Sequence, residues 1–245
     1  MAIPYRLCGA LVVAGVGSSA LGAAAFARNV ADSVGREVAA VVSGYGLADV
    51  LTEAVGGFFW FGALNSIRHA FEPLDAISKR FTASERELEE ENGLFFVRTS
   101  KDTASLIHLL KAQALEVPYL IGHSKGNLVI SEALYALDRS HPHRAQHIAE
   151  NTRIVTISAK VAMPRRFHRV LDIIGVWDSF GQLNSRPDIP ADVVVPRAWH
   201  STNPDFPLDM GIRVPRVLRE ALPRFEELTQ PPQTFLSMFA ARHVA

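Results

Sequence analysis

The chain has 245 residues, of which 48% are apolar and 20% charged, a composition typical of folded rather than disordered proteins. Its 25 basic residues are balanced by 25 acidic ones, so no net positive charge attracts a phosphate backbone, and we expect no nucleic-acid partner. Cys8 is the single cysteine, which excludes an intramolecular disulfide and a zinc site of the usual Cys/His spacing. We therefore expect no metal ion and no cofactor.

The first feature along the chain is an apolar run. Residues Leu7–Ala27 contain no charge and are numerous enough to cross the hydrocarbon core of a bilayer. Three interpretations are open: a helix inserted into or lying on a membrane, a cleaved secretory signal with the small-x-small site Ala25–Ala27, and a buried helix of a soluble protein. We expect membrane association, with a cleaved signal or a cytoplasmic location as the alternatives.

The residues that follow continue the helical and apolar character. Valines near helical spacing predict an amphipathic helix over 28–42. The aromatic block Phe58–Phe61 fits either a membrane interface or burial in a core. The acidic run Glu85–Glu91 predicts a boundary, which divides the chain into a helical, membrane-associated region over 1–84 and a second domain over 85–245.

From residue 94 onward, apolar strands alternate with helices, as is typical of a parallel sheet with crossover helices. Strands are predicted over 94–97, 118–121, 153–158, 170–176 and 192–195. Helices are predicted around 102–115, over 127–137 and, with interruptions at Pro215 and Pro223, over 211–228. The predicted fold class is α/β, a parallel sheet preceded by an all-helical apolar N-terminal region.

One pentapeptide in this pattern carries chemistry. Gly122–Gly126, with the sequence G-H-S-K-G, joins the strand over 118–121 directly to the helix over 127–137. A serine on such a tight strand-to-helix turn needs small neighbours on both sides, and the glycines provide them. The positive end of the helix dipole then points toward a developing oxyanion. Ser124 is therefore the candidate nucleophile.

This strand, turn and helix resemble the nucleophile elbow of the α/β-hydrolase superfamily, in particular of its lipases and esterases. The resemblance covers residues 94 to about 228 and implies a reduced α/β-hydrolase sheet. It also implies an acid after a later strand and a histidine after the last strand. Asp178, within Gly175–Asp178, and His200, within Ala198–Ser201, occupy these places in the required order.

Other acidic residues and histidines compete for the two roles. Asp172 starts the strand that leads to Asp178, so we expect it at the opposite edge of the sheet, while Asp188 is expected in a solvated loop. Three further histidines are predicted to lie at the surface, in a polar turn after the elbow helix, and not in the site: His141, His143 and His147. The side chain of His123 points away from that of Ser124, so packing or support of the oxyanion loop is its expected role.

A serine hydrolase also needs two backbone N–H groups that bind the oxyanion. The resemblance implies that Lys125, which follows the nucleophile, supplies one of them. If the strand over 94–97 is the neighbour of the elbow strand, the second donor comes from residues 99–101, and Ser100 is the predicted residue. The His-Gly sequence that the family often carries in this loop does not precede Ser124.

Together these residues predict a serine hydrolase that cleaves a carboxylic ester or thioester of an apolar acyl substrate, through Ser124, His200, Asp178 and an acyl-enzyme. The expected partners are an apolar ester or lipid-like substrate and the surface of a membrane or apolar particle. Two alternatives remain. One is a non-catalytic membrane- or partner-binding protein on a reduced hydrolase scaffold, and the other is an acyltransferase that forms the same acyl-enzyme.

Overall fold

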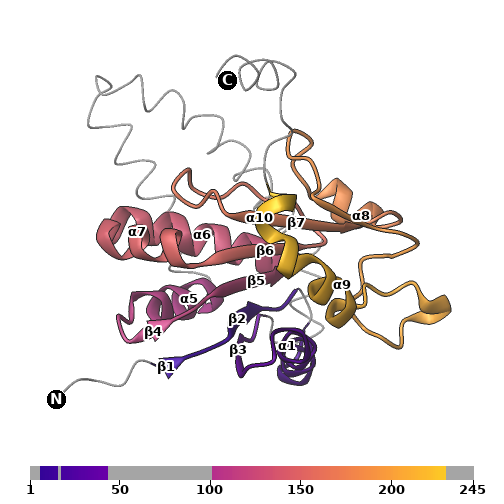
Figure 1. Ribbon diagram of the computed structural model, residues 1–245, viewed down its shortest axis with the longest axis horizontal. Helices are drawn as coiled ribbons and strands as arrows, with labels where there is room; N and C mark the ends of the chain where they lie inside the picture. Colours follow the sequence, from indigo (N-terminus) through magenta and orange to yellow (C-terminus); the bar gives the residue numbers. More distant parts are fainter. Residues whose placement is uncertain (1–5, 16–17, 44–100, 230–245) are drawn as a thin grey trace, which may run out of the picture.

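The computed structural model describes residues 6–15, 18–43 and 101–229 (Figure 1). Its central sheet has six parallel strands in the order β3-β2-β5-β6-β7-β8. These strands are β2 (Ala10–Val13), β3 (Val38–Val41), β5 (Tyr119–His123), β6 (Arg153–Ile157), β7 (Val170–Gly175) and β8 (Val193–Val195). A separate parallel pair is formed by β1 (Arg6–Leu7) and β4 (Leu115–Glu116). The predicted α/β class is confirmed.

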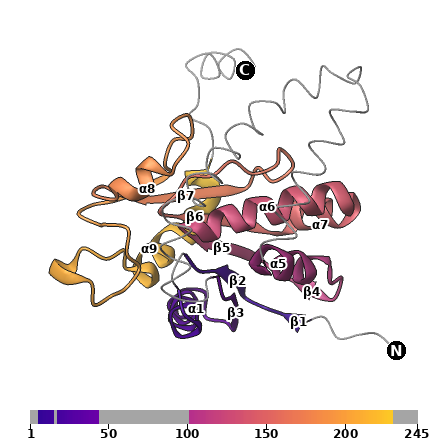
Figure 2. The same ribbon diagram turned by 180° about the vertical axis from the view of Figure 1, so that it is seen from behind.

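Helices cover both faces of the sheet (Figures 1 and 2). One face carries α1 (Ala20–Val34), α9 (Val214–Ala221) and α10 (Phe225–Leu228). The other carries α5 (Lys101–Lys111), α6 (Lys125–Ser140) and α7 (Pro142–Asn151). Three short elements complete the described part: α8 (Ser179–Leu183), η2 (Pro207–Asp209) and η3 (Leu222–Arg224). The result is a sheet between two helical layers, each with its own apolar core.

Strand β2 connects these two cores. Ala10 and Val12 belong to the core under α1 and α9, whereas Leu11 and Val13 belong to the core under α5 and α6. A strand that is buried on both faces is apolar at every position. The uncharged run Leu7–Ala27 therefore contains the central strand β2 and the first half of α1.

The prediction of an all-helical N-terminal region is wrong for the residues that the structure describes. Two strands of the main sheet, β2 and β3, come from this region. Helix α1 begins after Ser19, whose Oγ accepts a hydrogen bond from the N–H of Gly22 at 3.2 Å. It ends at Gly35, which adopts the left-handed conformation with φ of 65°. The helix predicted over 28–42 therefore stops early, and its last residues form β3.

Most elements predicted for the C-terminal half are confirmed. The structure has strands over four of the predicted segments, as β5, β6, β7 and β8, and the predicted helices as α5, α6 and the series α9, η3, α10. The polar turn predicted after the elbow helix is wrong, because α7 forms there. The strand over 94–97, the block Phe58–Phe61 and the boundary between 84 and 85 lie outside the described residues.

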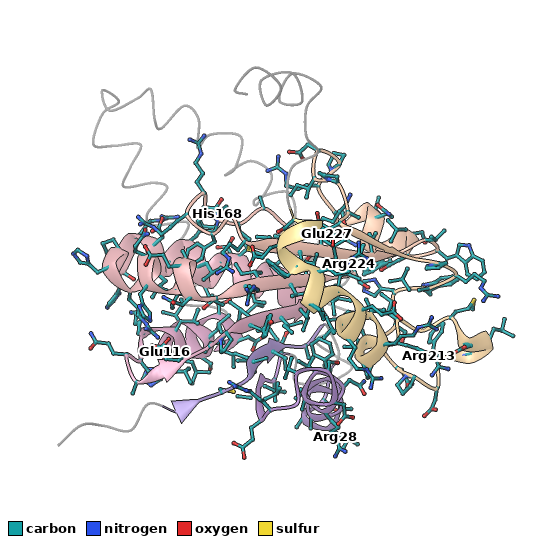
Figure 3. The ribbon with its side chains drawn as sticks, viewed as in Figure 1. Arg28, Glu116, His168, Arg213, Arg224 and Glu227 are labelled. Atoms are coloured by element: carbon teal, nitrogen blue, oxygen red, sulfur yellow. The ribbon has the colours of Figure 1, made fainter. Side chains whose placement is uncertain are left out.

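Charged side chains lie on the outer surface of the described residues (Figure 3). Charged side chains such as Arg28 on α1 and Arg213 before α9 lie at the periphery, outside the two cores (Figure 3). Among the described helices, none is both long and apolar enough to span a bilayer. Within the run Leu7–Ala27, the residues of β2 and the α1 residues Ala23, Phe26 and Ala27 are buried, whereas Leu21 is exposed.

Candidate active site

The site lies at the carboxyl edge of the sheet. Because the strands of the main sheet are parallel, the segments that follow β5, β7 and β8 leave the sheet at one edge. Ser124 follows β5, Asp178 follows β7 and His200 follows β8. In Figures 1 and 2, α8 and the loop between β8 and α9 project together at this end of the molecule. The topology thus brings together three residues that are distant in sequence.

Ser124 occupies a strained turn between β5 and α6. Its φ of 54° and ψ of −121° are unusual for a residue with a side chain. The backbone N–H of Ser124 donates to the carbonyl of Ile157 at 2.8 Å, which ties the turn to the end of β6. A Cβ atom on Gly126 would overlap the carbonyl oxygen of Val13 in β2. The second glycine of the motif is therefore required by the close approach of α6 to β2.

A continuous chain of hydrogen bonds joins the three side chains. His200 Nδ1 lies 2.8 Å from Asp178 Oδ1, and His200 Nε2 lies 2.8 Å from Ser124 Oγ. Since a carboxylate only accepts hydrogen bonds, the neutral imidazole carries its proton on Nδ1 and leaves Nε2 as an acceptor for the serine hydroxyl. This is the arrangement in which an imidazole can remove a proton from a serine.

Asp178 is held in place by the start of α8. Its side chain is fully buried, and its Oδ1 also accepts the N–H of Gly181 at 2.6 Å as the N-cap of that helix. Phe180 in the same helix packs edge-on against the imidazole of His200, with ring centroids 4.9 Å apart. The short helix α8 therefore orients the carboxylate and also covers one side of the imidazole.

The residues that compete for these roles lie elsewhere. Asp172 lies within β7, where it accepts a hydrogen bond from the hydroxyl of Thr156 on β6. Burial, and after it the carboxylate of Asp192, raises the pKa of Asp172 to about 7, against the opposing effects of Thr156 and Lys160. Asp188 pairs with Arg186. Neither aspartate takes part in the hydrogen-bond chain to Ser124.

The structure also shows supporting residues that the sequence did not reveal. The side-chain amide of Asn127 donates to the carbonyls of Ile157 at 3.0 Å and Ala159 at 2.9 Å. It therefore fixes the first turn of α6 to the end of β6, beside the bond made by Ser124. The sequence signal for this role is an amide residue at the start of an apolar helix, and the structure buries this amide completely.

The predicted oxyanion donors have different outcomes. Lys125 is the first residue of α6, directly after the nucleophile, as expected. Ser100 lies outside the described residues, and the condition behind its prediction fails because β5 is flanked by β2 and β6. The loop beside the elbow is instead the one after β2, since a Cβ atom on Gly15 would lie 3.1 Å from the Cβ of Ser124. The Gly and Ser residues that follow Val13 in the sequence are the signal that β2 ends there.

Exposed apolar side chains gather in the segments of the chain that carry Asp178 and His200. Most of the exposed large apolar residues in the described ranges lie in the two segments after β7 and β8, next to Asp178 and His200. We call this set the apolar rim: Val176, Trp177, Phe180, Leu183, Trp199 and Leu208. Trp177 is 46% exposed and Leu183 is 70% exposed. An apolar surface beside a nucleophile favours an apolar substrate.

An open cavity of about 810 Å³ lies beside β8 and α9. Trp177 and Ala198 line it, but Ser124, Asp178 and His200 do not.

Within the described ranges, no group of three or more His, Cys, Asp or Glu side chains is arranged to hold a metal ion.

Comparison of the chain with protein-family models, with curated proteins and with solved structures finds no match.

Proposed function

We propose that the protein is a serine hydrolase that cleaves a carboxylic ester or thioester of an apolar acyl group. The observation that carries this proposal is the hydrogen-bond chain from Asp178 through His200 to Ser124, with both distances at 2.8 Å. The positive φ of Ser124 supports it, because a serine is held in this conformation only when the surrounding structure imposes it. The apolar rim supports the apolar nature of the substrate.

In the proposed reaction, Ser124 Oγ attacks the carbonyl carbon while His200 Nε2 takes the serine proton. The buried carboxylate of Asp178 stabilises the imidazolium that forms. When the tetrahedral intermediate collapses, the proton passes to the leaving alcohol or thiol and the acyl group remains on Ser124. Water then attacks the acyl-enzyme with His200 again as the base, and releases a carboxylic acid.

We further infer that the chain is a reduced member of the α/β-hydrolase superfamily. In support, nucleophile, acid and histidine follow one another in the order Ser124, Asp178, His200, and the serine lies between a parallel strand and a helix. In the proposal the oxyanion donors are the N–H of Lys125, which begins α6, and a backbone N–H near Gly15, whose added Cβ would lie 3.1 Å from that of Ser124. The second oxyanion donor is thus proposed near Gly15 and no longer at Ser100.

We propose that the apolar rim, and not the run Leu7–Ala27, contacts a lipid or polymer surface. The described part of that run is committed to β2 and α1. Exposed tryptophans, such as Trp177 and Trp199, are suited to an interface between water and an apolar phase. The rim would thereby bring the serine close to a surface where apolar esters collect.

The test is covalent labelling with a fluorophosphonate probe, followed by mass spectrometry of the labelled peptide. We expect one adduct, on Ser124, and none in the Ser124→Ala variant, because only a base-activated serine attacks such a reagent at a useful rate. Folded protein that is not labelled would support the non-catalytic scaffold instead. Hydrolysis of p-nitrophenyl esters with and without an added alcohol acceptor separates a hydrolase from an acyltransferase.

A further inference from the structure

His200 is the member of the site that lies in an irregular loop. Ser124 and Asp178 are fixed at the starts of α6 and α8, but His200 lies between β8 and η2. Its neighbours in the loop are held by backbone hydrogen bonds, from Trp177 N–H to the carbonyl of Ala198 and from Trp199 N–H to that of Met210. The carbonyl of His200 itself faces two side chains of the adjacent strands.

These two side chains belong to His123 and Ser158. His123 Nε2 lies 2.9 Å from the carbonyl oxygen of His200, and Ser158 Oγ lies 3.4 Å from the same oxygen. A carbonyl only accepts hydrogen bonds, so Nε2 of His123 carries a proton. The shorter bond comes from the last residue of β5, directly before the nucleophile. One residue of the elbow therefore holds the base by its backbone while the next residue presents the hydroxyl.

The surroundings of His123 fix its ring. The ring lies between that of Phe26 on α1, with centroids 6.0 Å apart, and that of His200, with centroids 5.2 Å apart. A Cβ atom on Gly15 would lie 2.9 Å from Nδ1, so the loop after β2 closes the other side. Burial, followed by the charge that His200 acquires, lowers the pKa of His123 to about 4. His123 thus stays neutral while His200 takes up a proton.

We propose that His123 is a positioning residue, whose Nε2–H holds the backbone of His200 so that its imidazole stays aligned between Ser124 and Asp178. The inference rests on the proposed function and extends it to the residue before the nucleophile. A neutral donor suits this place because a lysine or arginine would put a permanent positive charge beside an imidazole that must become cationic. A purely apolar ring would fill the space without holding the carbonyl.

Two variants separate positioning from packing. His123→Gln keeps a side-chain N–H near the place of Nε2, whereas His123→Phe keeps the ring volume and loses the donor. With p-nitrophenyl butyrate as the probe substrate, we expect kcat of the phenylalanine variant to fall about tenfold, with KM nearly unchanged, since a lost hydrogen bond shifts the alignment and not substrate binding. The glutamine variant should keep most of the wild-type kcat.

The melting temperatures of the two variants show the effect of His123 on packing, separately from its effect on kcat. We expect the phenylalanine variant to be at least as stable as the glutamine variant, so that activity and stability rank the two in opposite order. Equal kcat for His123→Phe and wild type, or a lower kcat for His123→Gln than for His123→Phe, would overturn the positioning role. The matched control is His147→Phe, on the exposed side of α7, which should leave kcat unchanged.

Fluorophosphonate labelling of the same proteins distinguishes the two levels of the proposal. If wild-type Ser124 is labelled and His123→Phe is labelled at the wild-type rate, only the positioning role fails. If wild-type Ser124 is not labelled, the proposed function fails and the role of His123 fails with it. We expect labelling of the wild type and of His123→Gln at similar rates, and slower labelling of His123→Phe.

Discussion

Two buried aspartates near β7 have different relations to the serine. Asp178 hydrogen-bonds to His200, whereas Asp172 hydrogen-bonds to Thr156 within the sheet. We expect Asp178→Asn to lower kcat by roughly three to four orders of magnitude, because an amide favours the wrong tautomer of the imidazole. Ester hydrolysis and circular dichroism of the same preparation measure activity and fold together.

Asp172→Asn is the matched control for this variant. It changes the same functional group, within β7 and not after it, at a side chain that does not contact His200. Its kcat should remain within about threefold of the wild-type value. A large loss in Asp172→Asn with little loss in Asp178→Asn would contradict the assignment of the acid.

Asp172 also predicts a pH dependence of stability. Its pKa in the folded protein, about 7, is above the ordinary value of 3.8, so the folded state keeps this proton while the unfolded state loses it. The corresponding stability is complete below about pH 4 and is lost as the pH rises through 7. Asp172→Asn removes this loss.

The measurement is the melting temperature of wild type and Asp172→Asn at pH 5 and pH 8. We expect the advantage of the variant to be larger at pH 8, by a few degrees, since about 1 kcal/mol corresponds to roughly 2–4 °C for a domain of this size. Asp192, whose pKa burial also raises, is present in both proteins, and the backbone N–H of residue 172 that it accepts is kept in the variant. An equal difference at the two pH values would contradict the raised pKa of Asp172 in the folded protein.

At the scale of elements, local patterns predicted the part of the fold that carries the motif. Strand β5 and helix α6 were recognisable because an apolar strand, a glycine turn and an apolar helix follow one another without a linker. The strands predicted over 170–176 and 192–195 are β7 and β8, and Asp178 and His200 follow their ends, as predicted. These features depend on short-range sequence, which a single chain displays directly.

Strands β2 and β3 were not predicted, and the reason is physical. A parallel strand buried on both faces has no alternation, so β2 has the same appearance as part of an apolar helix. The valines of α1 and β3 lie near helical spacing across Gly35, which ends the helix by its backbone conformation. Pairing of β2 with β5 is a long-range contact that no local pattern displays, and Ser100 was predicted for this reason.

Contact between β2 and α6 yields a prediction at the same scale. Gly126→Ala would place a methyl group against the carbonyl of Val13, and a strand and a helix of the core would have to move apart. We expect a loss of stability above about 4 kcal/mol, or insoluble protein, measured by urea unfolding and by soluble yield. The control is Gly22→Ala in α1, where the nearest atom is the hydroxyl of Ser18, which can rotate away. A Gly126→Ala variant as stable as the wild type would contradict the close approach.

At the scale of the whole molecule, the apolar rim predicts binding to apolar surfaces. We expect wild-type protein to float with phosphatidylcholine vesicles on a density gradient. The double variant Trp177→Ser, Leu183→Ser should bind about tenfold or more weakly, because each side chain contributes roughly 1–2 kcal/mol when it leaves water. Val194→Ser, an equally exposed position on β8 outside the rim, is the control. Wild-type protein that stays entirely in the aqueous fractions would contradict the surface contact.

The order of the strands in the sheet also determines when each strand can pair with its neighbours during synthesis. Val12 pairs with Ala40 on one side and with Ile121 on the other, so the second partner of β2 is synthesised long after the first. Until residue 123 has left the ribosome, the wholly apolar strand β2 has an open edge, and pairings of this kind close slowly. During this interval the nascent chain is vulnerable to aggregation. The elbow is completed later still, because the carbonyl of Ile157, which accepts the N–H of Ser124, is made more than thirty residues after the serine.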